Sequence, residues 1–181
     1  MTELLQIKFL SEEQLSEEIK KQINDLDHEA FFAADQEKDE AFAKIEWASN
    51  EWMALGNIKD KLVTQLCLLK RQLKVGEVSV IVAGIGGVAT TTQWLKQGFS
   101  SLLLQSAADF MKKEMKVPFG LLICDDKLQK FYSKNGWQKV ADSLWFIQEG
   151  QRHPLKSCVM VIPLVNQEWP QGEIDLCGLP W

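Results

Sequence analysis

Apolar and polar residues near the start of the chain alternate with the spacing of an amphipathic helix. The residues Ser11-Glu12-Glu13-Gln14 match a capping box, in which a serine and the residue three positions later bind free amides at a helix start. Leu15 and Ile19 then recur at helical spacing, and these signals together predict a helix over about residues 12–24. Residues 35–44 are densely charged without a clear period, which favours a surface loop or a short helix.

After residue 50, apolar and β-branched residues gather in strand-like runs. Turn signals separate these runs, with Gly56-Asn57 after the first and Val75-Gly76-Glu77 after the second. Because consecutive strands joined by such turns usually pair with each other, we expect an antiparallel meander. The three runs are Trp52–Leu55, Leu62–Lys70 and Val78–Thr90.

The second half of the chain alternates helices and strands. An apolar face predicts a helix at Phe99–Lys116, and the apolar run Phe119–Cys124 is typical of a strand buried on both sides. Asp126 is placed to cap a further helix that ends at Asn135, where Gly136 supplies a left-handed stop. Two more strands are predicted, at residues 143–148 and 157–164. This order of elements predicts an α/β (α+β) fold with a mixed sheet.

The composition is that of a single globular domain. Of the 181 residues, 46% are apolar and 25% are charged, so the chain can bury one core and is too apolar for a disordered protein. We therefore expect one domain over residues 1–181. The net charge of -5 disfavours nucleic acid, whose phosphates attract basic surfaces, and is better suited to a cationic substrate.

The cysteines and the start of the chain exclude other classes of protein. Cys67, Cys124, Cys158 and Cys177 are widely spaced and form no Cys-x-x-Cys pair, so the sequence predicts neither a metal site nor a disulfide framework. No apolar run is long enough to span a bilayer, and residues 1–10 lack the features of a signal peptide. The sequence therefore predicts a cytoplasmic protein without a membrane partner.

A glycine-rich segment in the third run fits the dinucleotide fingerprint G-x-G-x-x-G/A. The segment is Gly84-Ile85-Gly86-Gly87-Val88-Ala89, and Asp109 follows about twenty residues later, near the position of a ribose-binding acid. The fingerprint requires a helix to begin within its glycines. The β-branched residues at 88 and 90–92 resist helix formation, which disfavours a Rossmann-type nucleotide site.

The turn before the helix at residue 99 carries the features of a phosphate site. Leu95-Lys96-Gln97-Gly98-Phe99-Ser100-Ser101 places a glycine and two hydroxyl side chains at the start of an apolar helix. Free N–H groups at the positive end of a helix dipole bind phosphate, and Lys96 adds a cation. An ordinary helix start has a similar composition, so the turn alone leaves both interpretations open.

Two motifs in this order resemble the GNAT family of N-acetyltransferases. Gly86-Gly87-Val88-Ala89-Thr90, followed by Gln97-Gly98-Phe99-Ser100-Ser101-Leu102-Leu103-Leu104, is similar to the family's core strand and its R/Q-x-x-G-x-G/A pyrophosphate loop. Phe119–Leu122 and Leu128–Trp137 resemble its next strand and its L-x-x-F-Y-x-x-x-G-W helix. The resemblance covers about residues 52–140 and implies the GNAT fold, a mixed, mostly antiparallel twisted sheet flanked by helices.

The resemblance implies an acetyl-CoA-dependent N-acetyltransferase in which an amine attacks the thioester directly. Tyr132 then protonates the departing thiolate, and a tyrosine, with an ordinary pKa of about 10, carries a proton at neutral pH. Amides of the core strand bind the acetyl carbonyl, as oxyanion chemistry favours. The implied cofactor-binding residues are Val88, Ala89, Thr90, Leu95, Lys96, Gln97, Gly98, Phe99, Ser100, Ser101 and Phe131. Leu95 replaces the usual Arg or Gln and Ser100 the usual Gly or Ala, which leaves the cofactor affinity open.

The acceptor half of the site is less defined. Within the family, the chain is most similar to aminoglycoside 2'-N-acetyltransferases and uncharacterised acetyltransferases. Gly86 stands where the aminoglycoside enzymes have a proton-relaying glutamate, and a glycine cannot act as a base. The acceptor is expected to be a primary amine of a small molecule, such as an aminoglycoside or another polyamine, or else a peptide amino group.

Other carboxylates and the last residue are the remaining candidates for the acceptor site. Glu46, Asp35 and Glu29 are candidates for the base or else solvated surface carboxylates. Glu46 and Trp181 are candidates for substrate binding, and Trp181 can equally be an apolar residue that closes the end of the sheet. An alternative from another class is a GNAT-fold protein without catalysis that binds acyl-CoA or forms a homodimer.

Overall fold

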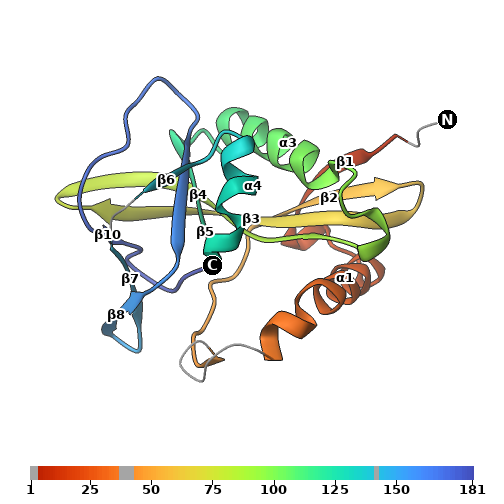
Figure 1. Cartoon of the computed structure of the whole chain (residues 1–181), viewed down its shortest axis with the longest axis horizontal. Coiled ribbons are helices and arrows are strands. Elements are labelled where there is room, and N and C mark those ends of the chain that lie inside the picture. Colours follow the sequence, from red (N-terminus) through yellow and green to blue (C-terminus); the bar gives the residue numbers. More distant parts are fainter. Residues whose placement is uncertain (1–3, 37–42, 141–142) are drawn as a thin grey trace. The chain divides into compact units, whose positions relative to one another are not determined.

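The computed structural model describes residues 4–36, 43–140 and 143–181, with the side chains of residues 32–36 outside the description (Figure 1). The strands are β1 (Gln6–Ser11), β2 (Trp52–Ile58), β3 (Lys61–Val75), β4 (Val78–Thr90), β5 (Phe119–Cys124), β6 (Gln138–Val140), β7 (Leu144–Gln148), β8 (Gln151–Leu155), β9 (Cys158–Pro163) and β10 (Ile174–Asp175). The helices are α1 (Glu17–Gln36), α3 (Phe99–Lys113) and α4 (Gln129–Lys134), with single 3-10 turns η1 (Glu12–Gln14), η2 (Thr92–Trp94) and η3 (Asp126–Leu128).

The chain forms two compact units. The first comprises residues 1–45, 50–68 and 87–107, and the second comprises residues 46–49, 69–86 and 108–181. The long strands β3 and β4 and the helix α3 each contribute residues to both units.

The first unit contains an antiparallel sheet in which β2 pairs with β1 on one side and with β3 on the other. Gly56 pairs with Thr64 and Asn57 with Leu62, so Val63 is an extra residue of β3 that bulges from the ladder. A bulge changes the face to which the following side chains point. It therefore decides which residues of β3 face each of the two helices.

The helices of the first unit contact side chains that alternate along β3. Gln65 bonds to Asp27 of α1, whereas the hydroxyl of the preceding residue, Thr64, is joined through Thr90 to Ser100 of α3. Successive side chains of a strand point to opposite faces, so α1 and the first turns of α3 cover opposite faces of these strands. The two helices are the orange and green ribbons of Figure 1.

An apolar cluster holds α1 on its face of the sheet. The helix contributes Ile23 and Leu26, which are 9% and 3% exposed. Their buried partners on the strands are Met53, Leu55, Leu62, Cys67 and Ala89. Fully burying a side chain of this size contributes about 1.5–3 kcal/mol, so this cluster fixes the position of α1.

The second unit contains a mixed sheet with the strand order β6-β9-β5-β4-β3-β10-β7-β8. β4 pairs with β5 in parallel, as β10 does with β7, whereas β9 is antiparallel to both β5 and β6. Leu121 and Leu122 of β5 are 0% and 1% exposed, as predicted for a strand buried on both faces. The predicted fold class, α/β with a mixed sheet flanked by helices, is confirmed.

The first helix begins later than the capping box predicts. The Ser11 N–H donates to Gln14 Oε1 at 2.9 Å, but this box closes the single turn η1 and not α1. The helix α1 begins at Glu17, where the Ser16 hydroxyl accepts from the Ile19 N–H. The strand β1, which precedes the box, was not predicted because one edge strand of six residues has little periodicity.

Two local predictions were wrong and three short strands were missed. Gly56-Asn57 is not a turn but part of β2. Gly56 is buried there, and a side chain would not fit because its Cβ would lie 2.6 Å from the Thr64 methyl. Asp125, and not Asp126, caps the turn before α4, since its carboxylate accepts from the Lys127 N–H at 3.0 Å. The missed strands are β6, β8 and β10. Strands of two to five residues pair through the backbone and give no clear sequence pattern.

Candidate active site

The glycine-rich segment is strand and not the start of a helix. Residues 84–89 all lie within β4, which excludes the Rossmann interpretation. Gly87 has φ +57, a left-handed conformation that interrupts the regular strand. The parallel ladder between β4 and β5 ends at the pair Ile85–Leu122, whereas β4 continues to Thr90.

The last residues of β4 present amides along one edge. The Thr91 N–H donates to the Val63 carbonyl of β3 at 3.0 Å. Since N–H groups of successive residues point to opposite edges of a strand, those of Val88 and Thr90 point away from β3. Val88 and Thr90 are half-buried, and Ala89 between them is buried. These two amides lie about 6.6 Å apart along the strand and are thus positioned to donate to successive acceptors of an extended ligand on this edge.

A chain of hydroxyl groups fixes the start of α3 against β4. Thr90 Oγ1 lies 2.8 Å from Thr64 Oγ1 and 2.7 Å from Ser100 Oγ. Thr64 also donates to the Ala89 carbonyl at 2.9 Å. Ser100, which departs from the family pattern, therefore forms a hydrogen bond that a glycine or alanine at this position could not form.

The turn before α3 has the backbone of an anion-binding loop. Lys96 and Gly98 have φ +62 and +85, and the first helical bond of α3 runs from the Leu102 N–H to the Gly98 carbonyl at 3.0 Å. The amides of Phe99, Ser100 and Ser101 consequently have no partner within the helix. The side chains of residues 95–98 are exposed, and that of Leu95 is 51% exposed. The loop can therefore bind phosphate through its backbone without the Arg or Gln that Leu95 replaces.

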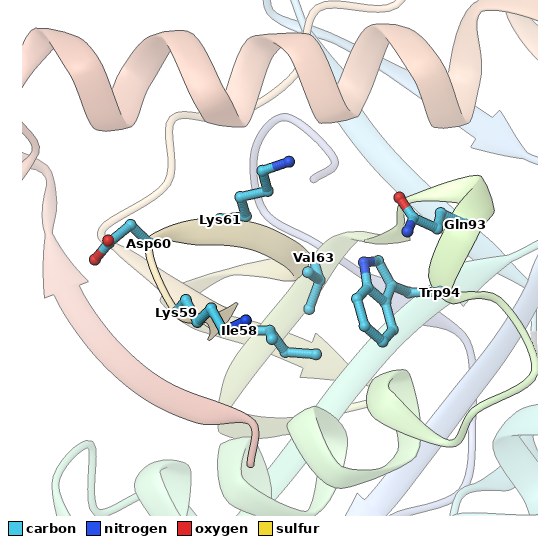
Figure 2. Close-up of a pocket in the computed structure, with 7 residues that line it drawn as sticks. All are labelled: Ile58, Lys59, Asp60, Lys61, Val63, Gln93 and Trp94. Carbon is cyan, nitrogen blue, oxygen red and sulfur yellow. The ribbon is translucent and has the colours of Figure 1, made fainter. Parts of the chain in front are cut away.

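A cavity of about 380 Å³ adjoins this loop in the first unit. Figure 2 shows Trp94 of η2 beside Val63, with the β2–β3 turn across from them. The Trp94 ring also packs on Phe99, the first residue of α3, with ring centroids 5.6 Å apart. Lys59 and Lys61 outnumber the single acidic residue of the lining, Asp60. The cavity thus combines an aromatic wall with positive charge and suits a ligand that has a ring and an anionic group.

Tyr132 lies in the second unit, on α4, and is 6% exposed. Its ring packs edge-on against Phe131, with centroids 5.0 Å apart, and against Trp137 at 6.4 Å. Burial, and then the neighbouring Cys124, raise the pKa of the Tyr132 hydroxyl well above its usual value. Among the residues that the structure describes, none forms a hydrogen bond with this hydroxyl. The raised pKa means that the hydroxyl keeps its proton at neutral pH.

Cys124 is the thiol beside Tyr132, and it is not an activated nucleophile. Burial, with a smaller contribution from the cross-strand neighbour Cys158, raises the pKa of Cys124 to about 12. A cysteine acts as a nucleophile through its thiolate, which is scarce at neutral pH when the pKa is so high. This chemistry favours direct attack by the acceptor over an acyl-cysteine intermediate.

The carboxylates that the sequence offers as site candidates lie in different surroundings. Glu29 of α1 accepts the Thr92 N–H at 2.5 Å, and its hydrogen bonds with Thr92 lower the pKa of the carboxyl, so Glu29 ties α1 to η2. Glu46 is exposed in the second unit, where its N–H donates to Gln148 Oε1 at 2.9 Å. The side chain of Asp35 lies outside the described residues.

Trp181 is buried against the middle of β4 in the second unit. It is 7% exposed, and its ring covers the space where a side chain at Gly84 would be. The Arg71 guanidinium lies over the same ring, 5.9 Å from its centroid. The Trp181 indole N–H is buried without a partner among the described residues. Trp181 therefore packs as a buried residue against β4, and its role in substrate binding stays a prediction.

We expect Gly84→Ala to lower the free energy of unfolding by about 1–3 kcal/mol, because the added methyl overlaps the Trp181 ring. Urea unfolding measures the change. The control is the same substitution in a Trp181→Leu background, where the smaller side chain leaves room for the methyl. Equal losses in both backgrounds would show that Trp181 is not the cause.

A polar pair that the sequence did not single out lies beneath α1. Gln65 of β3 donates from Nε2 to Asp27 Oδ1 at 2.7 Å, although Gln65 is only 1% exposed. Burial raises the pKa of Asp27, and the bond from Gln65 partly opposes this shift. The signal in the sequence is Thr64-Gln65, two polar residues within an otherwise apolar run.

Comparisons with known proteins bear on the family and on the fold. A family model described as an acetyltransferase (GNAT) domain matches residues 13–140. No curated protein matches this sequence. In the part of the chain that the structure describes, no helix is long and apolar enough to cross a membrane.

Solved structures, among them two named as acetyltransferases, share the fold at low sequence identity. Escherichia coli ElaA is 16% identical with a TM-score of 0.63, covering 88% of this chain and 99% of its own. The GNAT family N-acetyltransferase YhbS from Escherichia coli, solved in complex with CoA, is 14% identical with a TM-score of 0.63, covering 98% of this chain and 96% of its own. The catalytic domain of the Tetrahymena GCN5 histone acetyltransferase, in complex with coenzyme A, is 18% identical with a TM-score of 0.61, covering 92% and 96%.

Proposed function

Because the chain belongs to the GNAT acetyltransferase family, which supports acyl transfer from an acyl-CoA, we propose that it transfers an acetyl group from acetyl-CoA to a primary amine of a small molecule. The observation that carries this proposal is the pair of amides at Val88 and Thr90 on the free edge of β4, next to the phosphate loop before α3. The hydroxyl chain through Thr90 and Ser100 joins these two features. One ligand with a carbonyl group and a pyrophosphate can therefore use both.

Different residues are proposed to bind different chemical groups of acetyl-CoA. The amides of residues 99–101, with Lys96 beside them, suit the pyrophosphate. The cavity at Trp94, with Lys59 and Lys61, suits the ring and phosphate of the nucleotide end. The other residues of the proposed cofactor site are Ala89, Leu95, Gln97, Gly98 and Phe131.

Bound acetyl-CoA supplies an activated carbonyl carbon that a neutral amine can attack. A backbone N–H of the segment Val88–Thr90 donates to the carbonyl oxygen as it gains negative charge, and such donation is usually the largest electrostatic contribution in acyl transfer. Tyr132 gives its proton to the sulfur as the carbon–sulfur bond breaks. The raised pKa of Tyr132 keeps this proton in place at neutral and mildly alkaline pH.

The acceptor is proposed to be a cationic small molecule, such as an aminoglycoside or another polyamine. The net charge of -5 supports this choice, and Glu46 and Trp181 stay candidates for binding it. Acetylation of a peptide amino group is the alternative. The single domain over residues 1–181, the cytoplasmic location and a homodimer likewise stay predictions.

Two measurements test the proposed function. We expect acetyl-CoA at about 100 times its Kd to stabilise the protein by about 2.7 kcal/mol, which raises the Tm of a chain of this size by about 5–10 °C. We also expect free CoA thiol to appear with at least one amine among aminoglycosides, spermidine, amino acids and short peptides. A Tm shift without thiol release would favour the non-catalytic acyl-CoA-binding alternative, and no Tm shift would contradict the cofactor assignment.

A further inference from the structure

The Asp27–Gln65 pair has an arrangement that a purely structural contact does not need. The Gln65 side chain is only 1% exposed, yet its Oε1 has no hydrogen-bond partner among the described residues. Its Nε2 donates to Asp27. A buried acceptor without a partner costs about 1–3 kcal/mol. A leucine at position 65 would avoid this cost, so the glutamine is kept for the bond that it gives to Asp27.

Asp27 is half-buried, so its carboxylate remains in reach of a ligand. Only Oδ1 is used by Gln65, and no charged group contributes to the shift of its pKa. The apolar cluster on this face consists of residues of α1 and the strands, including Cys67. The bond from Gln65 thus orients the carboxylate, and within the described part of the chain the second oxygen is left to accept a proton.

The pair lies beside the segment of β4 that is proposed to bind the acetyl carbonyl. The bond from the Thr91 N–H to Val63 sets the two antiparallel strands so that Gln65 stands opposite Ala89. The same register puts Cys67 opposite Gly87, where a Cβ would lie 3.4 Å from the Cys67 sulfur. Ala89 belongs to the cluster beneath α1, so the side chains of Asp27 and Ala89 lie on the same face of these strands.

We propose that Asp27 accepts the proton of the acceptor amine and that Gln65 is the residue that positions its carboxylate. This inference rests on the proposed function. As the carbon–nitrogen bond forms and the carbon–sulfur bond breaks, one proton passes from the amine nitrogen to Asp27 Oδ2, and another from Tyr132 to the sulfur. Solvent then takes the proton from Asp27 and returns one to Tyr132, so the net reaction is amine plus thioester to amide plus thiol. Asp27 fills the role for which Gly86 has no side chain.

The test uses Asp27→Asn, in which the new amide oxygen can still accept the bond from Gln65 but cannot take a proton. With the amine that reacts fastest in the acceptor screen, we expect kcat/KM to fall by at least about tenfold, with water left as the base. Asp25→Asn, an exposed residue on the same helix, is the matched control and should leave kcat/KM unchanged.

A second variant and a second readout separate the proposed role from a structural one. Gln65→Leu removes the bond that lowers the pKa of Asp27, so the acid limb of the pH profile of kcat/KM should move to higher pH. The raised pKa means that ionised Asp27 costs stability above its folded pKa. Asp27→Asn should therefore raise the Tm at pH 8, by a margin that narrows as the pH falls.

The possible results distinguish the two proposals. If the wild type releases thiol and Asp27→Asn does so equally fast with the same pH profile, the proposed function stands and the role of Asp27 is overturned. The same holds if Gln65→Leu leaves the acid limb in place. If the wild type binds acetyl-CoA but no amine releases thiol, both the catalytic function and the role of Asp27 fall.

Discussion

Replacing Tyr132 by phenylalanine is expected to lower kcat by about 10²-fold or more with little change in KM. The substitution removes only the hydroxyl, because the ring keeps its contacts with Phe131 and Trp137. The loss falls on kcat because the proton is given as the sulfur departs and not when acetyl-CoA binds. Steady-state kinetics of thiol release measure both constants.

The matched control for this variant is Ser133→Ala, on the exposed side of the same helix. It should leave kcat, KM and Tm unchanged, while Tyr132→Phe should retain the Tm shift with acetyl-CoA. Because the pKa of Tyr132 is raised, the wild-type kcat should not fall through loss of its proton at mildly alkaline pH. An unchanged kcat in Tyr132→Phe would remove Tyr132 from the mechanism.

The second large effect is expected at Gly98. Gly98 has φ +85, and no atom lies within 4 Å of an added Cβ. A valine side chain therefore has room, but its backbone would be strained at this positive φ. A left-handed conformation costs an L-residue about 1–2 kcal/mol, and turning the peptide to relieve it loses an amide hydrogen bond to pyrophosphate worth about 1.5–3 kcal/mol. We therefore expect Gly98→Val to weaken CoA binding by about 10²-fold, as measured by calorimetry.

Gly150 provides a matched control for the strain alone. It has φ +73 and nothing within 4 Å of an added Cβ, and it lies in the β7–β8 turn, away from the loop in sequence. Gly150→Val should lower the Tm about as much as Gly98→Val does and leave the Kd of CoA unchanged. A similar loss of affinity in both variants would mean that the loop before α3 does not bind the cofactor.

Features that depend on residues close together in the sequence could be predicted from the sequence alone. The runs at residues 78–90 and 119–124 are strands with the predicted bounds, because β-branched and apolar residues favour extended backbone whatever their partners are. Gly76 and Gly136 have φ +55 and +87, the turn and the helix stop that glycine allows at low cost. The order of the two motifs, and with it the family, is likewise a property of the sequence alone.

Features that join distant residues were decided by the tertiary structure. Glu29 is a candidate base by sequence, but its carboxylate binds the N–H of Thr92, 63 positions away. Asp27 is a candidate because its carboxylate is bound by Gln65, 38 positions away. The bulge at Val63 determines that Gln65 faces α1 and Thr64 faces α3. Strand register and helix placement depend on how the apolar residues of the whole chain are buried together. A local sequence pattern does not contain this information, because the contacts join residues that are distant in the sequence. The sequence by itself therefore determined the strands at residues 78–90 and 119–124 and the helix stop at Gly136, while the tertiary structure alone showed that Gln65 binds the Asp27 carboxylate.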